Sequence, residues 1–320
     1  MKNLLNDEIN ALVGDILNDY NLKRRIDTDQ IYSQPDKAVI TEILSNLQKI
    51  IFRGYYRNQH YRIYTAQNNL SMLLEDILFN LSKQIMLVFE GKAVAENEEN
   101  TELEEKAYDI CIAFLSQIPK LREALEMDAQ AAYDGDPAAA GIEEIIFSYP
   151  GFYAIFVYRI AHELQLLHVP LIPRMMTEIA HSATGIDIHP GATIGRSFFM
   201  DHGTGIVIGE TTIIGDNVKV YQGVTIGALS TRGGQNLRNK KRHPTIEDNV
   251  TIYSNASILG GDTVIGRNAV IGGNTFITKS VPANTSVSIA SPELIYRYGN
   301  HTEKEKLQEL TQEENWDWTI

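Results

Sequence analysis

The residues best suited to catalysis in this chain are a histidine and two aspartates. Asp201 and His202 are adjacent, and Asp187 lies 15 residues before His202. A carboxylate that holds an imidazole in one tautomer prepares it to act as a general base toward a hydroxyl group. A histidine alone is more often structural, so the accompanying aspartates favour the catalytic interpretation. If the fold brings Asp187 to His202, the pair indicates base-activated transfer to a hydroxyl.

A second candidate site is the pair Arg242 and His243, which ends a basic stretch. Between Thr231 and His243 there are five basic residues and no acidic ones: Arg232, Arg238, Lys240, Lys241 and Arg242. A basic segment on an acidic protein attracts an anionic ligand locally. The alternative is an ordinary solvated loop, and the sequence leaves both open.

Metal binding is not expected. His202 and His243 stand apart, with no His-x₄-His pair and no cysteine nearby, and His189 precedes Pro190 and is expected to turn away. No glycine-rich nucleotide loop accompanies a strand–helix pattern, so nucleoside triphosphate and NAD chemistry are unsupported.

These residues lie in a stretch, 186–282, whose apolar positions recur every six residues. A period of six fits neither an α-helix nor an isolated strand, and it is typical of a parallel β-helix built from triangular coils. A run of β-hairpins would need alternation and irregularly spaced turns instead. With about 18 residues per coil, Asp187 is placed one turn below His202, within reach of the imidazole. The period breaks in three places: a two-residue slip between Ile206 and Ile208, an interruption after Ile226, and one extra residue before Ile265. The apolar positions are Ile188, Ile194, Met200, Ile206; Ile208, Ile214, Val220, Ile226; Ile246, Ile252, Ile258; Ile265, Ile271, Ile277.

The chain therefore divides into three parts. Residues 1–185 are expected to be helical, 186–287 to form a left-handed parallel β-helix, and 288–320 to form a flexible tail. Apolar stripes and breakers predict helices over 38–52, 70–89, 105–115, 119–132, 141–148 and 152–167. Residues 228–243 are too polar and glycine-rich to continue the coils, so they should protrude as a loop.

Composition narrows the class of protein. With 320 residues the chain can hold two domains, and its net charge of -13 argues against nucleic acid as the main partner. The single cysteine, Cys111, lies in an apolar run and is expected to be a core residue; one cysteine suits a reducing cytoplasm. No apolar run is long enough for a membrane span, and the N-terminus does not resemble a signal peptide.

Several motifs between residues 133 and 287 resemble those of the serine O-acetyltransferases, the hexapeptide-repeat enzymes of cysteine biosynthesis. The Asp-His-x-Thr-Gly and Arg-His-Pro elements are the most specific of them. The motifs are Asp136-Pro137-Ala138, Gly151-Phe152 with Ala154, Tyr158-Arg159-Ile160, Asp187-Ile188-His189-Pro190, Asp201-His202, the segment from Thr204 to Thr211, and Arg242-His243-Pro244.

The resemblance implies a reaction and a set of roles. Acetyl would pass from acetyl-CoA to the hydroxyl of L-serine, with His202 as general base and Asp187 as the carboxylate that orients it. The resemblance assigns Asp136, Asp201, Arg242 and His243 to the amino acid, and Ala228, Ser254 and Gly273 to the coenzyme A groove. It also implies a homotrimer or a hexamer of two trimers, and capture of the C-terminal Ile320 by O-acetylserine sulfhydrylase.

Two features depart from the family pattern. The basic loop is longer than the common Gly-Gly-Asp-Arg-His-Pro form, and Ser288-Ile289-Ala290-Ser291-Pro292 replaces the usual Ala-Gly-Val-Pro-Ala. These departures leave the cofactor contacts and inhibition by cysteine open. The alternatives are another hexapeptide acyltransferase, acting on homoserine or a sugar, and a non-catalytic scaffold for a sulfhydrylase.

Overall fold

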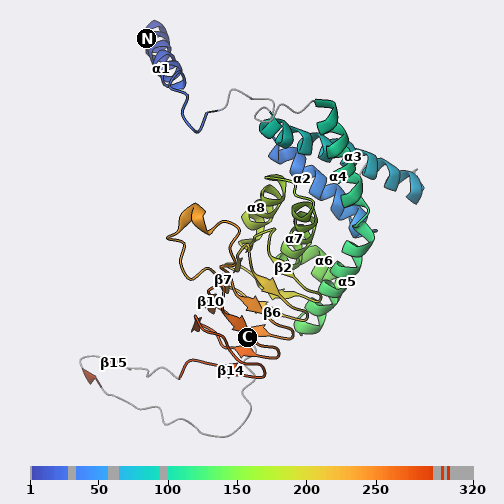
Figure 1. The fold of residues 1–320 in the computed structure, drawn as a ribbon, viewed down its shortest axis with the longest axis vertical. Helices are drawn as coiled ribbons and strands as arrows, with labels where there is room; N and C mark the ends of the chain where they lie inside the picture. Colours follow the sequence, from blue (N-terminus) through green and yellow to red (C-terminus); the bar gives the residue numbers. More distant parts are fainter. Residues whose placement is uncertain are drawn as a thin grey trace.

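A computed structural model describes residues 2–27, 34–56, 65–93 and 100–290, together with two short strands at 297–298 and 301–302. Helices are followed by stacked coils of short parallel strands (Figure 1), which confirms the predicted fold class. The tail predicted to be flexible lies almost wholly outside the described residues. Within them, no helix combines the length and apolar character needed to cross a membrane.

Six of the helices match the predicted ranges closely, whereas α1 and α8 had no predicted range. The acidic stretch 91–106, which its charge marks as a solvated connection or a helix end, contains the end of α3 and the start of α4, and residues 94–99 lie outside the described part. Cys111 on α4 is fully buried, and burial raises the pKa of its thiol to about 12, as suits a core residue. The helices are α1 (Lys2–Tyr20), α2 (Lys37–Ile51), α3 (Ala66–Ala93), α4 (Asn100–Leu115), α5 (Ile118–Gly135), α6 (Ile142–Ser148), α7 (Pro150–Leu166) and α8 (Ile172–Thr184).

No helix was predicted over α8, where Pro173 is a residue that usually interrupts a helix. Pro173 lies in the first turn, where a missing N–H costs no hydrogen bond. Gly185 ends the helix with φ 72, a left-handed conformation that glycine adopts readily. The prolines and glycine therefore delimit a helix here.

The coils stack into three parallel sheets, one for each side of the prism. The sheet orders are β1-β4-β7-β10-β13, β2-β5-β8-β11 and β3-β6-β9-β12-β14. The strands are β1 (Asp187–Ile188), β2 (Thr193–Ile194), β3 (Phe199–Asp201), β4 (Val207–Ile208), β5 (Ile213–Ile214), β6 (Lys219–Tyr221), β7 (Thr225–Gly227), β8 (Thr245–Ile246), β9 (Thr251–Ile252), β10 (Ser257–Leu259), β11 (Val264–Ile265), β12 (Val270–Ile271), β13 (Phe276–Ile277) and β14 (Ser286–Val287).

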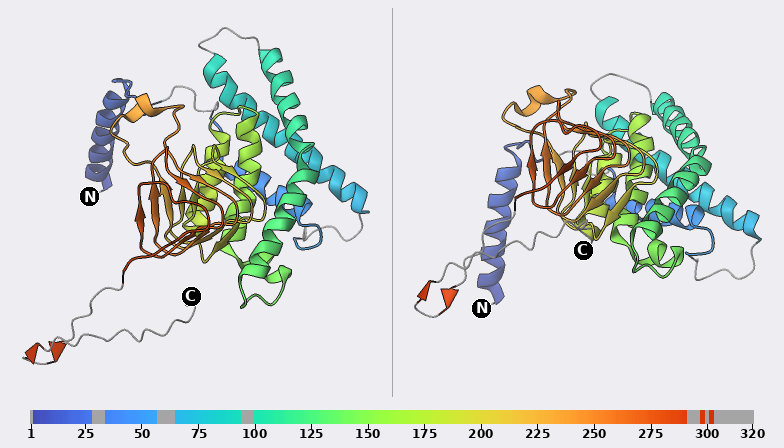
Figure 2. Two further views of the ribbon diagram at one scale, coloured as in Figure 1. Left: turned by 60° about the horizontal axis from the view of Figure 1, so that its bottom comes forward. Right: turned by 90° about the horizontal axis from the view of Figure 1, so that it is seen from below.

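The register of these sheets explains the six-residue period. Ile188, Ile208, Ile226 and Ile258 stack on one another through β1, β4, β7 and β10, and all four are buried. The apolar position of each hexapeptide therefore fills the prism. Residues 228–243 project from the coils between β7 and β8 and carry the short 3₁₀ helix η1 (Gly234–Leu237), the orange turn in Figure 2.

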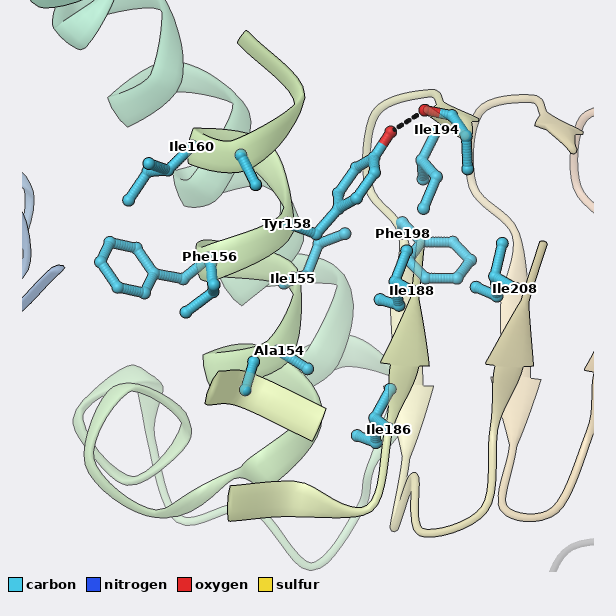
Figure 3. Packing of buried hydrophobic residues seen from close by; sticks show 14 of the residues in the cluster. Ala154, Ile155, Phe156, Tyr158, Ile160, Ile186, Ile188, Ile194, Phe198 and Ile208 are labelled. Atoms are coloured by element: carbon cyan, nitrogen blue, oxygen red, sulfur yellow. Dashed lines mark hydrogen bonds between the residues drawn. The ribbon is translucent and has the colours of Figure 1, made fainter. Parts of the chain in front are cut away.

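Helices α5 and α7 close the first coil of the prism. Tyr158 of α7 donates to the Ala192 carbonyl at 2.6 Å, and Figure 3 shows its ring directed at the coil beside Ile194 and Phe198. Beside it, Arg159 pairs with the fully buried Asp128 of α5 at 2.5 Å. These contacts cover the end of the β-helix at which the candidate site lies.

Candidate active site

His202 stands on the corner between β3 and β4. Residues 202–206 form this corner, whereas the equivalent corner between β6 and β7 has only residues 222–224. These two additional residues account for the two-residue slip in the apolar series between Ile206 and Ile208. His202 has φ 56 and a side chain that is 61% exposed. The neighbouring Gly203 has φ 82, a left-handed conformation that favours glycine, and a Cβ there would also lie 2.4 Å from Ile186 Cδ1.

Asp187 lies on the same corner, one coil below. Its backbone N–H donates to the Ile206 carbonyl at 2.9 Å, which places β1 directly beside the residues that follow His202. The carboxylate of Asp187 accepts from Nη1 of Arg174 on α8 at 3.0 Å. Among the described residues no hydrogen bond joins Asp187 to His202 directly, so the orienting role of Asp187 stays a prediction.

The structure brings Asp136, Asp201 and His202 together. Asp136, at the end of α5, accepts from the Tyr149 hydroxyl at 2.5 Å. Asp201 is 9% exposed and its carboxylate is 3.7 Å from His202 Nε2. Burial raises the pKa of Asp201, and the charge of Asp136 raises it further against the opposing effect of His202. Two neighbouring carboxylates in this position favour a cation such as an ammonium group.

Arg242 and His243 end the loop between β7 and β8, and they contact a different corner, the one between β4 and β5. Arg242 forms an ion pair with Glu210, and its backbone N–H donates to Thr211 Oγ1 at 2.9 Å. Nδ1 of His243 accepts from the Thr211 N–H at 3.0 Å. Burial, and then the charge of Arg242, lower the pKa of His243 to about 4. The imidazole is therefore neutral at pH 7, and the accepting role of Nδ1 places its proton on Nε2.

The pKa of His243 predicts a pH-dependent loss of stability. Its value in the unfolded chain is about 6.5, so between pH 6.5 and 4 the unfolded chain binds more protons than the folded one. The stabilisation is fully present above pH 6.5 and is lost as the pH falls toward 4. The melting temperature should therefore fall less steeply from pH 7 to 4.5 in His243→Gln, which keeps an acceptor for Thr211. Parallel slopes in the two proteins would contradict this assignment.

The two clusters do not meet within one chain. The corner with His202 precedes β4, and the corner with Glu210 follows β4, so one side of the prism separates them. Each cluster holds groups suited to one end of an amino acid: carboxylates for an ammonium group at the first corner, and a guanidinium for a carboxylate at the second. Within this chain the two sets of groups therefore stand apart.

Similarity to known proteins assigns the family. No protein-family model matches the chain. A plasmid serine acetyltransferase of Synechococcus elongatus is 42% identical over 269 residues, which are 82% of this chain and 84% of that relative. This chain belongs to the serine acetyltransferase family. Solved serine acetyltransferases share its fold: isoform 3 of Entamoeba histolytica in complex with cysteine is 37% identical, with a TM-score of 0.68 over 80% of this chain and 84% of that chain. The Neisseria gonorrhoeae serine acetyltransferase in complex with serine is 27% identical, with a TM-score of 0.51 over 78% of this chain and 95% of that chain.

The residues that the serine acetyltransferase resemblance assigns to coenzyme A fall on both corners. The register places Ser254 above Gln222, and Gln222 above His202. Gly273 follows in the same column, where an added Cβ would lie 3.1 Å from the Ser254 carbonyl oxygen. Ala228 instead stands on the other corner, one coil above Glu210. Sequence reasoning missed Gln222, whose buried Oε1 has no hydrogen-bond partner among the residues that the structure describes.

The basic loop is only partly available to a ligand. Nζ of Lys241 donates to the carbonyls of Thr211 at 2.7 Å and Pro244 at 3.0 Å, and burial lowers the pKa of its amine. Lys241 therefore fastens the loop to the coil. Arg232, Arg238 and Lys240 are exposed, with no acidic residue between them in the loop.

One group of side chains in the described part of the chain has spacing that would suit a metal ion. One ligand atom each from Glu178, His181 and Asp187 lie within 4.8 Å of one another. Arg174 forms ion pairs with both carboxylates, so a fixed guanidinium already supplies positive charge there.

The hydrogen-bond and ion-pair partners of the predicted site residues could be anticipated only in part. Glu210 belongs to a recognised motif, and an acid beside Thr211 in the repeat was a usable signal for a partner of Arg242. Tyr149 and Arg174 carry no such signal, because their contacts depend on how helices pack against the first coil.

Proposed function

We propose that this protein is a serine O-acetyltransferase, which transfers acetyl from acetyl-CoA to the hydroxyl of L-serine and forms O-acetyl-L-serine for cysteine biosynthesis. The observation that carries the proposal is the corner that holds Asp136, Asp201 and His202, where a general base stands beside two carboxylates suited to an ammonium group. Similarity to a solved relative in complex with serine supports the choice of acceptor. The single cysteine supports a cytoplasmic location.

In the proposed reaction, His202 takes the proton of the serine hydroxyl as that oxygen attacks the thioester carbonyl carbon. The tetrahedral intermediate then expels the thiolate of coenzyme A, which receives the proton from the imidazolium. Asp187 orients the ring and stabilises the imidazolium. Arg242 and the Nε2–H of His243 bind the serine carboxylate, and Ser254 and Gly273 continue the His202 corner as a track for the acyl donor.

We also infer that the working unit is a homotrimer or a hexamer of two trimers. Packing three prisms side by side sets the His202 corner of one chain against the Arg242 corner of its neighbour. That arrangement would unite the ammonium and carboxylate clusters, which one chain holds apart on opposite sides of β4.

The test is release of free coenzyme A thiol from acetyl-CoA with L-serine, L-homoserine or a galactoside as acceptor. Arg242→Ala should raise KM for serine by about tenfold or more, the cost of an unpaired charged hydrogen bond, and change KM for acetyl-CoA little. Faster thiol release with homoserine or a galactoside would show that L-serine is not the acceptor. No thiol release with any of the three would favour the alternative of a non-catalytic scaffold. A larger effect on KM for acetyl-CoA would move Arg242 to the coenzyme phosphates.

The proposed partner is O-acetylserine sulfhydrylase, engaged through Ile320. That residue lies outside the described part of the chain, so the proposal rests on the family resemblance, in which the last residue is captured in a pocket of the partner. Burying an isoleucine side chain is worth roughly 1.5–3 kcal/mol, so deleting Ile320 should weaken binding about ten- to a hundredfold. Titration of the sulfhydrylase with the full-length protein and the truncated form measures this. Equal affinities would reject the contact, and acetyl transfer should be equal in both forms.

A further inference from the structure

The carboxylate of Asp187 is held from outside the β-helix. Arg174 lies in the first turn of α8, and its Nη1 is 3.0 Å from Asp187 Oδ1. Glu178, one turn further along α8, binds the other arm of the same guanidinium. The second oxygen of Glu178 is 3.1 Å from Nδ1 of His181. The Arg174 side chain thus links α8 to Asp187 on β1.

The charges around this carboxylate make the arginine necessary. Glu178 and Asp187 present oxygens within 4.8 Å of each other, so the two like charges would repel without a cation between them. On the β-helix side, burial lowers the pKa of His189; Arg174 lowers it further, while Glu210 and Asp187 oppose the shift. On the other side of the corner, His202 faces Asp201, which in turn faces Asp136. Arg174 is thus the charged partner bound directly to the side chain of Asp187.

We propose that Arg174 is a positioning residue for acyl transfer, an inference that rests on the proposed function. Its guanidinium fixes one oxygen of Asp187 from α8 and leaves the other oxygen to accept the ring N–H of His202. A carboxylate fixed in this way keeps its charge and direction while the imidazole becomes an imidazolium. The ion pair between Arg174 and Glu178 joins two partly exposed side chains of one helix and contributes little to stability. The bond from Arg174 to Asp187 on β1 is therefore the contact through which Arg174 acts on the site.

The experiment compares Arg174→Met with Glu178→Gln, a matched control that removes the other partner of the guanidinium and keeps the bond to Asp187. Arg174→Met should lower kcat by about tenfold through loss of orientation, with KM for serine little changed. The acid limb of its pH–rate profile should also move up by about half a pH unit, because removing a nearby cation favours the protonated base. Arg174→Lys keeps the charge, so it should restore the acid limb and only part of kcat. Glu178→Gln should stay within twofold of the wild-type protein.

A kcat within twofold of wild type and an unmoved acid limb in Arg174→Met would overturn the proposal. So would an equal loss in Glu178→Gln, which would make the network a support for α8 only. If the Met variant does not fold, Arg174→Lys decides: a wild-type kcat rejects the role, and a threefold or larger loss supports it.

NMR titration of the His202 ring in the folded protein separates this inference from the proposed function. The titration midpoint in Arg174→Met should rise by about half a unit whether or not serine is the acceptor. Absence of serine acetylation by the wild-type protein would reject the proposed function. An unchanged midpoint would reject the role of Arg174.

Discussion

Replacing His202 should lower kcat by roughly two to four orders of magnitude, the range for losing a positioned general base. This corresponds to about 3 to 5 kcal/mol of activation barrier. Alanine is not a clean test alone, because position 202 has φ 56 and alanine is strained there. His202→Asn is the matched variant, since asparagine tolerates the left-handed region but cannot act as the base.

Both variants should lose turnover alike and keep the fold, because the side chain of His202 is 61% exposed. Steady-state thiol release measures kcat, and thermal unfolding measures stability. If His202→Asn kept more than half of the wild-type kcat, His202 would not be the base. If only the alanine variant lost activity, the corner backbone rather than the imidazole would be responsible.

Replacing Arg159 with alanine should destabilise the protein by about 3 to 5 kcal/mol, the usual cost of removing one partner of a buried ion pair. Arg159 is 9% exposed and its partner Asp128 is fully buried, so the change leaves an unpaired carboxylate in the core. It also removes the donor to the Gly195 carbonyl at 2.8 Å. Urea unfolding gives the free energy of unfolding for each variant.

The double variant Arg159→Met and Asp128→Leu is the control for charge. It removes both ions and should recover part of the loss, because no uncompensated charge remains. Some loss should persist, since Asp128 also accepts from the Phe198 N–H at 2.9 Å. A single-variant loss below about 1 kcal/mol would place this pair with the weak surface ion pairs instead.

The β-helix could be predicted from the sequence because its period is a direct product of its geometry. Each coil repeats an apolar residue that points into the prism. The spacing of Ile188, Ile208 and Ile226 therefore predicts both the fold and its register. The slip before Ile208 was visible too, and it marks the enlarged corner that carries His202. Composition and period could not reveal α8, because its two ends use the residues that usually mark irregular chain.

The sequence predicts a set of site residues, whose roles stay a prediction, but it does not predict how those residues are arranged in space. Asp136 comes from the end of α5 and Asp201 from β3, and only the packing of α5 on the first coil brings them together. The division of the site between two corners follows from the register, which a list of motifs does not contain. Arg174 was missed for the same reason, since nothing in its sequence neighbours marks the contact with Asp187.

The two ends of the prism differ in how they meet solvent. The first coil is closed by Tyr158 and Arg159, whereas the last coil, at β13 and β14, has a strand neighbour on one side only. In a solenoid each repeat is held mainly by its neighbours, so local unfolding should start at the open end and stop before the closed one. His202 and Asp187 then lie where opening is rarest, and Gly273 where it is most frequent. In the proposed roles, the general base therefore stands at the rigid end of the prism, and the residues proposed to line the coenzyme A track extend toward the end that loosens more often.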